Sequence, residues 1–321
     1  MVMLSAYIRL AEVGIGCPDW PACYARLAPD AEERKGVTVL TEDSHNIAYY
    51  GARIAHRYIA SALGLFIVAI FIIAMRQGSA RTSHIFVPLT IFTITVFLSL
   101  LGYYTPTRSN PLITMGNLLG GMALLGLLWW LMQRDSSAYD TPVDSTFFRP
   151  LARVALALIL LQIVLGGWSS ANYASANCPS LLHCNGEILS IENTADAFNP
   201  ARAIELDSTG QVVQPDSLGL LSMVHRLFAM LTAGYLAWLV RKLKSNTELE
   251  PKLGSTIVAL SIFSIGQVVL GVSMIWLHMP LLMLSLHNTL AAGLLLSSVN
   301  LLHRLTPPAG SPLPATQQPH H

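Results

Sequence analysis

The sequence predicts an all-α polytopic membrane protein built as two pseudo-symmetric four-helix bundles. Long apolar segments separated by short polar ones predict the helices, and motifs repeated between the two halves predict the bundles. Of the 321 residues, 53% are hydrophobic and 12% are charged, whereas a soluble domain has about 25% charged residues. The net charge of +1, with no concentrated basic patch, argues against a nucleic-acid partner.

Seven apolar segments have the length of roughly 20 residues that a membrane-spanning helix needs. They cover residues 54–75, 84–103, 112–133, 150–171, 218–240, 255–277 and 281–302. Residues 1–14 are apolar at their start but too short to span alone. We therefore expect about eight transmembrane helices, with the first truncated or with a natural start further upstream. No cleavable signal peptide is expected, because a positive n-region and a small-residue cleavage site are missing.

Lysine and arginine in the short connections predict the orientation of the chain. The connections that we assign to the cytoplasm carry Arg76, Arg81, Arg134, Arg149, Arg153, Arg241, Lys242, Lys244, Lys252 and Arg304. The segments that then face the periplasm or the exterior are 15–51, 104–110, 172–217 and 278–280. Residues 307–321 are expected to form a disordered cytoplasmic tail.

The four cysteines form two similar pairs, each with five residues between the sulfurs and a proline after the first cysteine. Cys17 and Cys23 lie in one outer loop, and Cys178 and Cys184 lie in another. Because disulfides persist in the oxidising environment outside the cytoplasm, we expect the bonds Cys17–Cys23 and Cys178–Cys184. The alternative is a metal clip, but neither loop completes a four-ligand zinc site.

Constant offsets relate the two halves of the chain. The two cysteine pairs are 161 positions apart, His56 and His225 are 169 apart, and Asn117 and His287 are 170 apart. These offsets predict two parallel four-helix halves, residues 1–140 and 141–306. The glycine pairs Gly120-Gly121 and Gly166-Gly167 would let helices approach closely.

Seven of the ten histidines are expected to be solvated or interfacial, where the ring tip stays wet. They are His45, His84, His183, His278, His303, His320 and His321, with His278 the least certain. His56, His225 and His287 instead lie just inside the outer ends of predicted spans. Ionisable groups at that depth usually face a bundle interior with a partner or cofactor, although a structural histidine bonded to a neighbouring helix is an alternative.

His225 and His287 occupy the second and fourth helices of the C-terminal half, near the same leaflet. Two neutral imidazoles facing each other across a bundle suit a six-coordinate heme iron. Arg226 is placed to pair with a heme propionate, and its alternative role is to snorkel to lipid headgroups.

Several segments together resemble the bacterial heme A synthase family. They are SAYIRLAEVGIGCPDWPACY, ARIAHRY, NLLGGMALLGLLWWL, LQIVLGGWSSANYASANCP, VHRLFA, QVVLGVS and LSLHNTLAAGLLLSSVNLLHRL, in order from Ser5 to Leu305. The resemblance implies eight helices in two halves with outer-loop disulfides. It also implies a b-type heme between His225 and His287, and an N-terminal site where a methyl group of heme O is oxidised to the formyl of heme A for cytochrome c oxidase.

The sequence departs from the family pattern at two positions of the N-terminal site. Arg53 stands where the family has a glutamate three residues before His56, and Asn117 stands where it has a second histidine. A guanidinium cannot replace a carboxylate as a proton acceptor, and asparagine is not a usual iron ligand. Met115 is expected to be a core residue, because it lies about 200° around the helix from Asn117.

We expect His56, Arg53, Arg57 and Asn117 to line a heme pocket under the outer loop, with His56 as ligand on one face. The two arginines would hold the propionates, or else serve as interfacial anchors. The candidate catalytic residues are accordingly His56, Arg53 and Asn117, and the candidate iron ligands are His225, His287 and His56.

Three interpretations follow from the sequence. The first is a heme A synthase-like oxidoreductase with heme b as cofactor and heme O and heme A as substrate and product. It would be a multi-pass protein of the bacterial inner membrane, partnered by heme O synthase, oxidase assembly factors and quinol or another reductant, with homo-oligomerisation left open. The second is a heme b-binding paralogue acting in heme handling, electron transfer or oxidase assembly. The third is a scaffold without heme.

Overall fold

A computed structural model describes most of the predicted membrane region. The described residues are 1–11, 43–76, 83–104, 110–135, 147–178, 180–181, 183–184, 194–202, 204, 215, 217–277 and 279–306. Their regular structure is helical, which confirms the all-α prediction.

Each of the seven predicted spans is a helix in the structure. The elements are α1 Val2–Ala11, α2 Asp43–Arg76, α3 Ser83–Tyr104, α4 Pro111–Asp135, α5 Phe148–Ala171, the 3₁₀ helix η3 Ala174–Asn177, α6 Thr194–Ala197, α7 Leu218–Lys244, α8 Glu250–Trp276 and α9 Leu281–Arg304. Helices α2–α5 and α7–α9 are long and apolar enough to cross a membrane, so the chain is a polytopic membrane protein. Helix α1 has 10 residues and, as predicted, is too short to span.

Helix α2 begins earlier than the sequence predicts. It starts at Asp43, whereas the predicted span starts at residue 54. A search for apolar residues finds only the part of a helix that lipid surrounds, while the backbone hydrogen bonds continue through polar sequence. The end of the predicted outer loop, including His45, is therefore helical.

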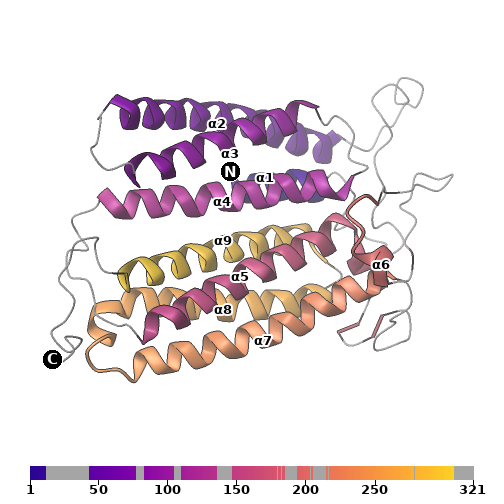
Figure 1. The fold of residues 1–321 in the computed structure, drawn as a ribbon. Helices are drawn as coiled ribbons and strands as arrows, with labels where there is room; N and C mark the ends of the chain where they lie inside the picture. Colours follow the sequence, from indigo (N-terminus) through magenta and orange to yellow (C-terminus); the bar gives the residue numbers. More distant parts are fainter. Residues whose placement is uncertain are drawn as a thin grey trace, which may run out of the picture.

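The helices lie side by side along a common direction (Figure 1). The four C-terminal helices form a closed ring, because α5 packs on α7, α7 on α8, α8 on α9, and α9 on α5. Helix α3 packs between α2 and α4, and α4 joins this group to α5 and α9. The predicted boundary at residues 140 and 141 falls between α4 and α5, and the division into two domains stays a prediction.

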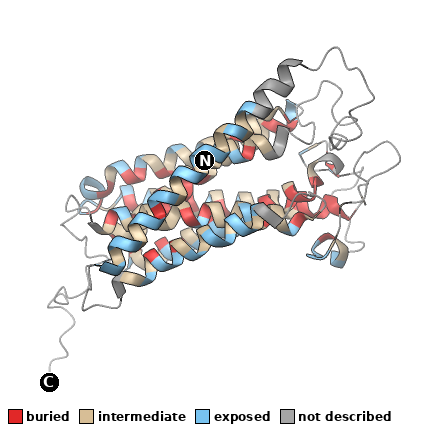
Figure 2. Cartoon of the chain, turned by 90° about the horizontal axis from the view of Figure 1, so that it is seen from above, coloured by how far each residue is buried: buried red, intermediate tan, exposed pale blue. Residues whose placement is uncertain are grey.

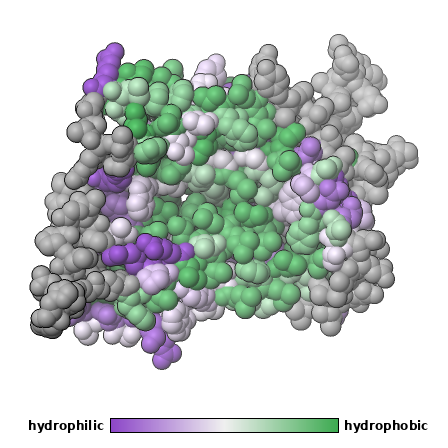
Figure 3. Space-filling view, in the orientation of Figure 1, coloured by the Kyte–Doolittle hydropathy of each residue, from purple (hydrophilic) through white to green (hydrophobic). Residues whose placement is uncertain are grey.

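Buried residues gather on the inward faces of the helices and near η3 and α6 (Figure 2). A large apolar cluster joins the ring helices through residues such as Ala152, Leu239 and Leu260, each 0% exposed. A smaller cluster of Ile67, Ile91 and Leu124 joins α2, α3 and α4. Apolar side chains cover the middle of the face in Figure 3, and hydrophilic residues lie toward its edges, as expected of a surface that lipid surrounds.

Polar side chains on α3 form bonds within their own helix. The hydroxyls of Thr90, Thr93, Thr95 and Ser99 each donate to the backbone carbonyl four residues earlier, at 2.8–2.9 Å. Such bonds satisfy a hydroxyl where no water is available. Helix α3 can therefore carry four hydroxyls and still span a membrane.

Glycines permit close helix packing at two of the predicted positions. A Cβ at Gly120 would lie 2.7 Å from Cδ2 of Leu98 on α3, and one at Gly167 would lie 2.5 Å from Cδ2 of Leu118 on α4. Both distances are too short for a methyl group, so glycine brings α4 close to α3 and α5 close to α4.

Candidate functional site

His225 and His287 line the same cavity within the ring of α5, α7, α8 and α9. The cavity has a volume of about 530 Å³. His225 lies seven residues after the start of α7 and His287 six residues after the start of α9. At 1.5 Å per residue these distances along the helices are nearly equal, and both helices start at the end of the ring that carries η3 and α6 (Figure 1). The structure thus brings together the two predicted ligands at one depth.

Each of these imidazoles contacts a glutamine and a glycine of a neighbouring helix. Nδ1 of His225 lies 2.9 Å from Nε2 of Gln162 on α5, and Nε2 of His287 lies 3.3 Å from Nε2 of Gln267 on α8. A Cβ at Gly166 would lie 2.6 Å from Cε1 of His225, so no larger residue fits against this ring. The corresponding distance from Gly271 to Cε1 of His287 is 3.4 Å.

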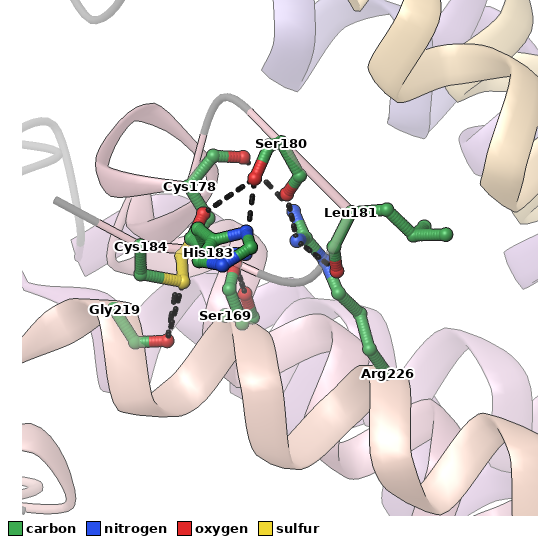
Figure 4. Close-up of a disulfide and its surroundings, with 9 residues drawn as sticks. Ser169, Cys178, Ser180, Leu181, His183, Cys184, Gly219 and Arg226 are labelled. Carbon is green, nitrogen blue, oxygen red and sulfur yellow. Dashed lines mark hydrogen bonds between the residues drawn. A yellow bond between two sulfur atoms is a disulfide. The ribbon is translucent and has the colours of Figure 1, made fainter. Parts of the chain in front are cut away.

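Arg226 follows His225 on α7 and reaches into the loop that carries Cys178 and Cys184 (Figure 4). Its guanidinium donates to the carbonyl oxygens of Ser180, Leu181 and Cys178. The arginine also lines the cavity, so it joins the loop to the helix that carries the histidine. The guanidinium has these three carbonyl partners in the structure. Its pairing with a heme propionate stays a prediction.

Cys178 and Cys184 form a disulfide, as the sequence predicts. The bridge is buried against Gly219 on α7, where an added Cβ would lie 3.1 Å from Cβ of Cys184. The bonded pair excludes the metal-clip alternative for this loop, because both sulfurs are used. Cys17 and Cys23 lie outside the described residues.

The predicted N-terminal site is less enclosed than the C-terminal one. His56 and Arg53 are half-buried on α2, whereas Arg57 is exposed. Asn117 is exposed on α4, while Met115 is 5% exposed and is a core residue, as predicted. None of the five lines the cavity that contains His225 and His287. A pocket lined by His56, Arg53, Arg57 and Asn117 stays a prediction.

The remaining histidines are spread along the chain. His183 is exposed in the disulfide loop, as predicted. His303 is half-buried at the end of α9, and its ring centroid lies 5.1 Å from that of Trp130 on α4. His278, His320 and His321 lie outside the described residues, and the side chains of His45 and His84 are likewise not described.

The cavity fits a heme with two histidine ligands. Its volume lies within the range of about 300–1,000 Å³ that is usual for small-molecule sites. The structure describes no hydrogen-bond partner for the buried Nδ1 of His287, which leaves one ring nitrogen for a ligand. Apolar side chains such as Leu118, Ile159 and Leu236 form most of the lining. Paired imidazoles in an apolar bundle core suit a low-spin heme.

The sequence alone did not predict a role in the site for Gln162, Gln267 or Gly271. A signal was present, because the segments QIVLG at 162–166 and QVVLG at 267–271 repeat the same pattern. An amide inside an apolar helix also needs a partner. The partner could not be named before the helices were placed in space.

The fold and site define a multi-pass membrane protein with a paired-histidine cavity in a four-helix ring. Residues 1–299 match the family of cytochrome oxidase assembly proteins, COX15-CtaA, and the chain belongs to this family. A heme A synthase of Shewanella oneidensis is 34% identical over 313 residues, which cover 94% of this chain and 91% of that protein. A heme A synthase of Flavobacterium psychrophilum is 23% identical, covering 95% and 94%.

Proposed function

We propose that the protein is a heme A synthase that oxidises the methyl group of heme O to the formyl group of heme A. The whole-length similarity to heme A synthases supports this activity. The observation that carries the heme-binding part is the cavity lined by both His225 and His287. Together they favour an oxidoreductase over a membrane scaffold, which has no need for two imidazoles that line one cavity at one depth.

In this proposal the C-terminal cavity holds a b-type heme, which relays electrons or stabilises the fold. His225 and His287 bind its iron from α7 and α9. The N-terminal helices hold heme O, with His56 on one face of the heme and Arg53 and Arg57 near its propionates. The conversion of the methyl to the formyl group removes four electrons and four protons and takes up one oxygen atom from water, so a redox partner that accepts electrons completes the reaction.

The charge distribution supports an orientation with the disulfide loop outside a bacterial inner membrane. Basic residues occupy the last turns of α2, α4, α7 and α9. These four helices end on the side opposite η3 and α6 (Figure 1). Positive residues favour the cytoplasmic side, and disulfides favour the other. Heme O synthase and oxidase assembly factors are the proposed partners on this membrane.

A second candidate is a heme b-binding paralogue without oxidation chemistry. Arg53 and Asn117 favour it, because they replace the carboxylate and the second histidine of the family pattern. Such a protein would keep the C-terminal heme and act in heme handling, electron transfer or oxidase assembly.

Expression with and without a heme O source, followed by mass analysis of the extracted hemes, separates these functions. The proposed synthase yields heme A only when heme O is supplied. Heme b alone, without turnover, contradicts the synthase and supports the paralogue. Purified, folded protein that contains no heme contradicts both. The His56→Ala variant is the matched control, because it removes the N-terminal ligand and leaves the C-terminal cavity unchanged.

A further inference from the structure

The two imidazoles of the cavity have similar surroundings on opposite sides of the ring, although Gln162 meets Nδ1 of His225 and Gln267 meets Nε2 of His287. Gln162 and Gly166 lie nine and five residues before the end of α5 at Ala171. Gln267 and Gly271 lie nine and five residues before the end of α8 at Trp276. Because α5 and α8 alternate with α7 and α9 around the ring, each histidine helix meets a helix that carries the same glutamine and glycine.

The glycine and the glutamine restrict each ring in complementary ways. Gly166 and Gly271 leave room for the edge of the imidazole at Cε1. Four residues earlier, and so on the same helix face, the glutamine amide meets one ring nitrogen. The other ring nitrogen, Nε2 in His225 and Nδ1 in His287, is left for a ligand. For the buried Nδ1 of His287 the described residues supply no hydrogen-bond partner.

The glutamines have acceptor capacity that the described contacts do not use. Oε1 of Gln162 and Oε1 of Gln267 are both buried, and the structure describes no hydrogen-bond partner for either. Leaving a buried acceptor unsatisfied is unfavourable, so the two glutamine oxygens point to a donor that the described contacts do not supply. An imidazole that binds iron through one nitrogen carries a proton on the other and needs an acceptor there.

We propose that Gln162 and Gln267 are positioning residues that orient the imidazoles of His225 and His287 and accept a hydrogen bond from the ring nitrogen that does not bind iron. A half-turn of each amide places Oε1 where Nε2 now lies. At Gln162 this exchanges the bond from Nε2 to the backbone oxygen of His225, now 3.0 Å, for the bond to the ring. The inference rests on the proposed heme site.

This role has a consequence that helix packing alone would not produce. An acceptor on the ring N–H makes the imidazole a stronger donor to iron and so favours the ferric state. Removing the acceptor should raise the reduction potential of the heme, whereas a carboxylate, which is a stronger acceptor, should lower it. A glutamine that only joined two helices would give no such opposite shifts.

The test compares Gln162→Leu, Gln267→Leu, Gln162→Glu and Gln267→Glu in the purified full-length protein. Heme content, the midpoint potential from a redox titration, and the low-spin electron paramagnetic resonance spectrum are measured for each. We expect a higher midpoint in the leucine variants, a lower midpoint in the glutamate variants, and shifted resonance positions in both. Gln133→Leu is the matched control, because Gln133 is 2% exposed on α4 and bonds within its own helix.

The outcomes separate the inference from the proposed function. Wild-type protein without heme contradicts the heme site itself. If all variants bind heme with an unchanged midpoint potential, the inference is overturned and the heme site is left intact. Midpoint shifts of the same sign in the leucine and glutamate variants have the same meaning. Should the leucine variants lose heme, retention of heme at a lowered midpoint in the glutamate variants supports the inference. Loss of heme from all four variants indicates a role in folding and overturns it.

Discussion

The C-terminal helices and the N-terminal helices are related by sequence, but their interiors differ in chemistry. The offset of 169 that relates His56 to His225 also relates Leu98 to Gln267 and Gly102 to Gly271. The first histidine and a glycine thus recur in both halves. The glutamine has become leucine, and the second histidine, His287, corresponds to Asn117.

These replacements change what fills the space between the helices. Leu98 packs against Gly120 on α4 and contributes to the apolar cluster of α2, α3 and α4. Its C-terminal counterpart, Gln267, instead lines a cavity with His287. A leucine in place of the glutamine can still pack between two helices, because packing requires only a side chain of suitable volume. It cannot orient an imidazole, because that requires a hydrogen-bonding atom at a particular place.

The largest expected effect comes from removing a histidine of the C-terminal cavity. His225→Ala or His287→Ala should each eliminate one heme equivalent per protein, because one imidazole cannot complete a six-coordinate iron. Heme per protein, measured as the pyridine hemochrome, checks this. His183→Ala, in the exposed loop, is the control. Full heme retention in both cavity variants would remove the basis of the comparison between the halves.

A methyl group at Gly166 should have the next largest effect. Gly166→Ala places a Cβ 2.6 Å from the ring of His225, whereas Gly271→Ala meets His287 at an ordinary 3.4 Å. Overpacking typically costs about 1–3 kcal/mol, so we expect heme affinity to fall roughly 5- to 150-fold for Gly166→Ala and much less for Gly271→Ala.

Heme titration of both glycine variants measures these affinities. Gly234→Ala is the control, because no described atom lies within 4 Å of its added Cβ. Equal affinities for Gly166→Ala and Gly234→Ala would show that His225 does not need its present position.

Restoring the family pattern in the N-terminal half sharpens the comparison most directly. The double variant Arg53→Glu, Asn117→His supplies a carboxylate and a second imidazole. General acid–base catalysis contributes about 100-fold at its low end. With a heme O source, we therefore expect heme A per protein to rise by about tenfold or more.

The heme A yield of this double variant is compared with that of Arg57→Glu, Asn117→His. The control places the carboxylate on the exposed neighbour instead. An equal yield in both double variants and the wild type would mean that other groups do the work of the carboxylate.

The sequence predicted the helices well and their ends less well. Apolar runs identified each spanning helix, because lipid tolerates few polar residues in a span. The start of α2 at Asp43 was missed, since hydropathy does not detect helix outside the bilayer. His225 and His287 line one cavity in the structure, at a nearly equal depth that can be counted along the chain. Whether they bind a heme stays a prediction.

The sequence by itself determined the membrane-spanning helices and the Cys178–Cys184 disulfide, because each depends on composition and spacing along one segment. Only the tertiary structure decided that Gln162 faces His225, that Gln267 faces His287 and that Arg226 holds the carbonyls of the disulfide loop. The physical reason is that a helix presents several faces. Which face meets a neighbour depends on how all the helices pack together, and no single segment contains that information.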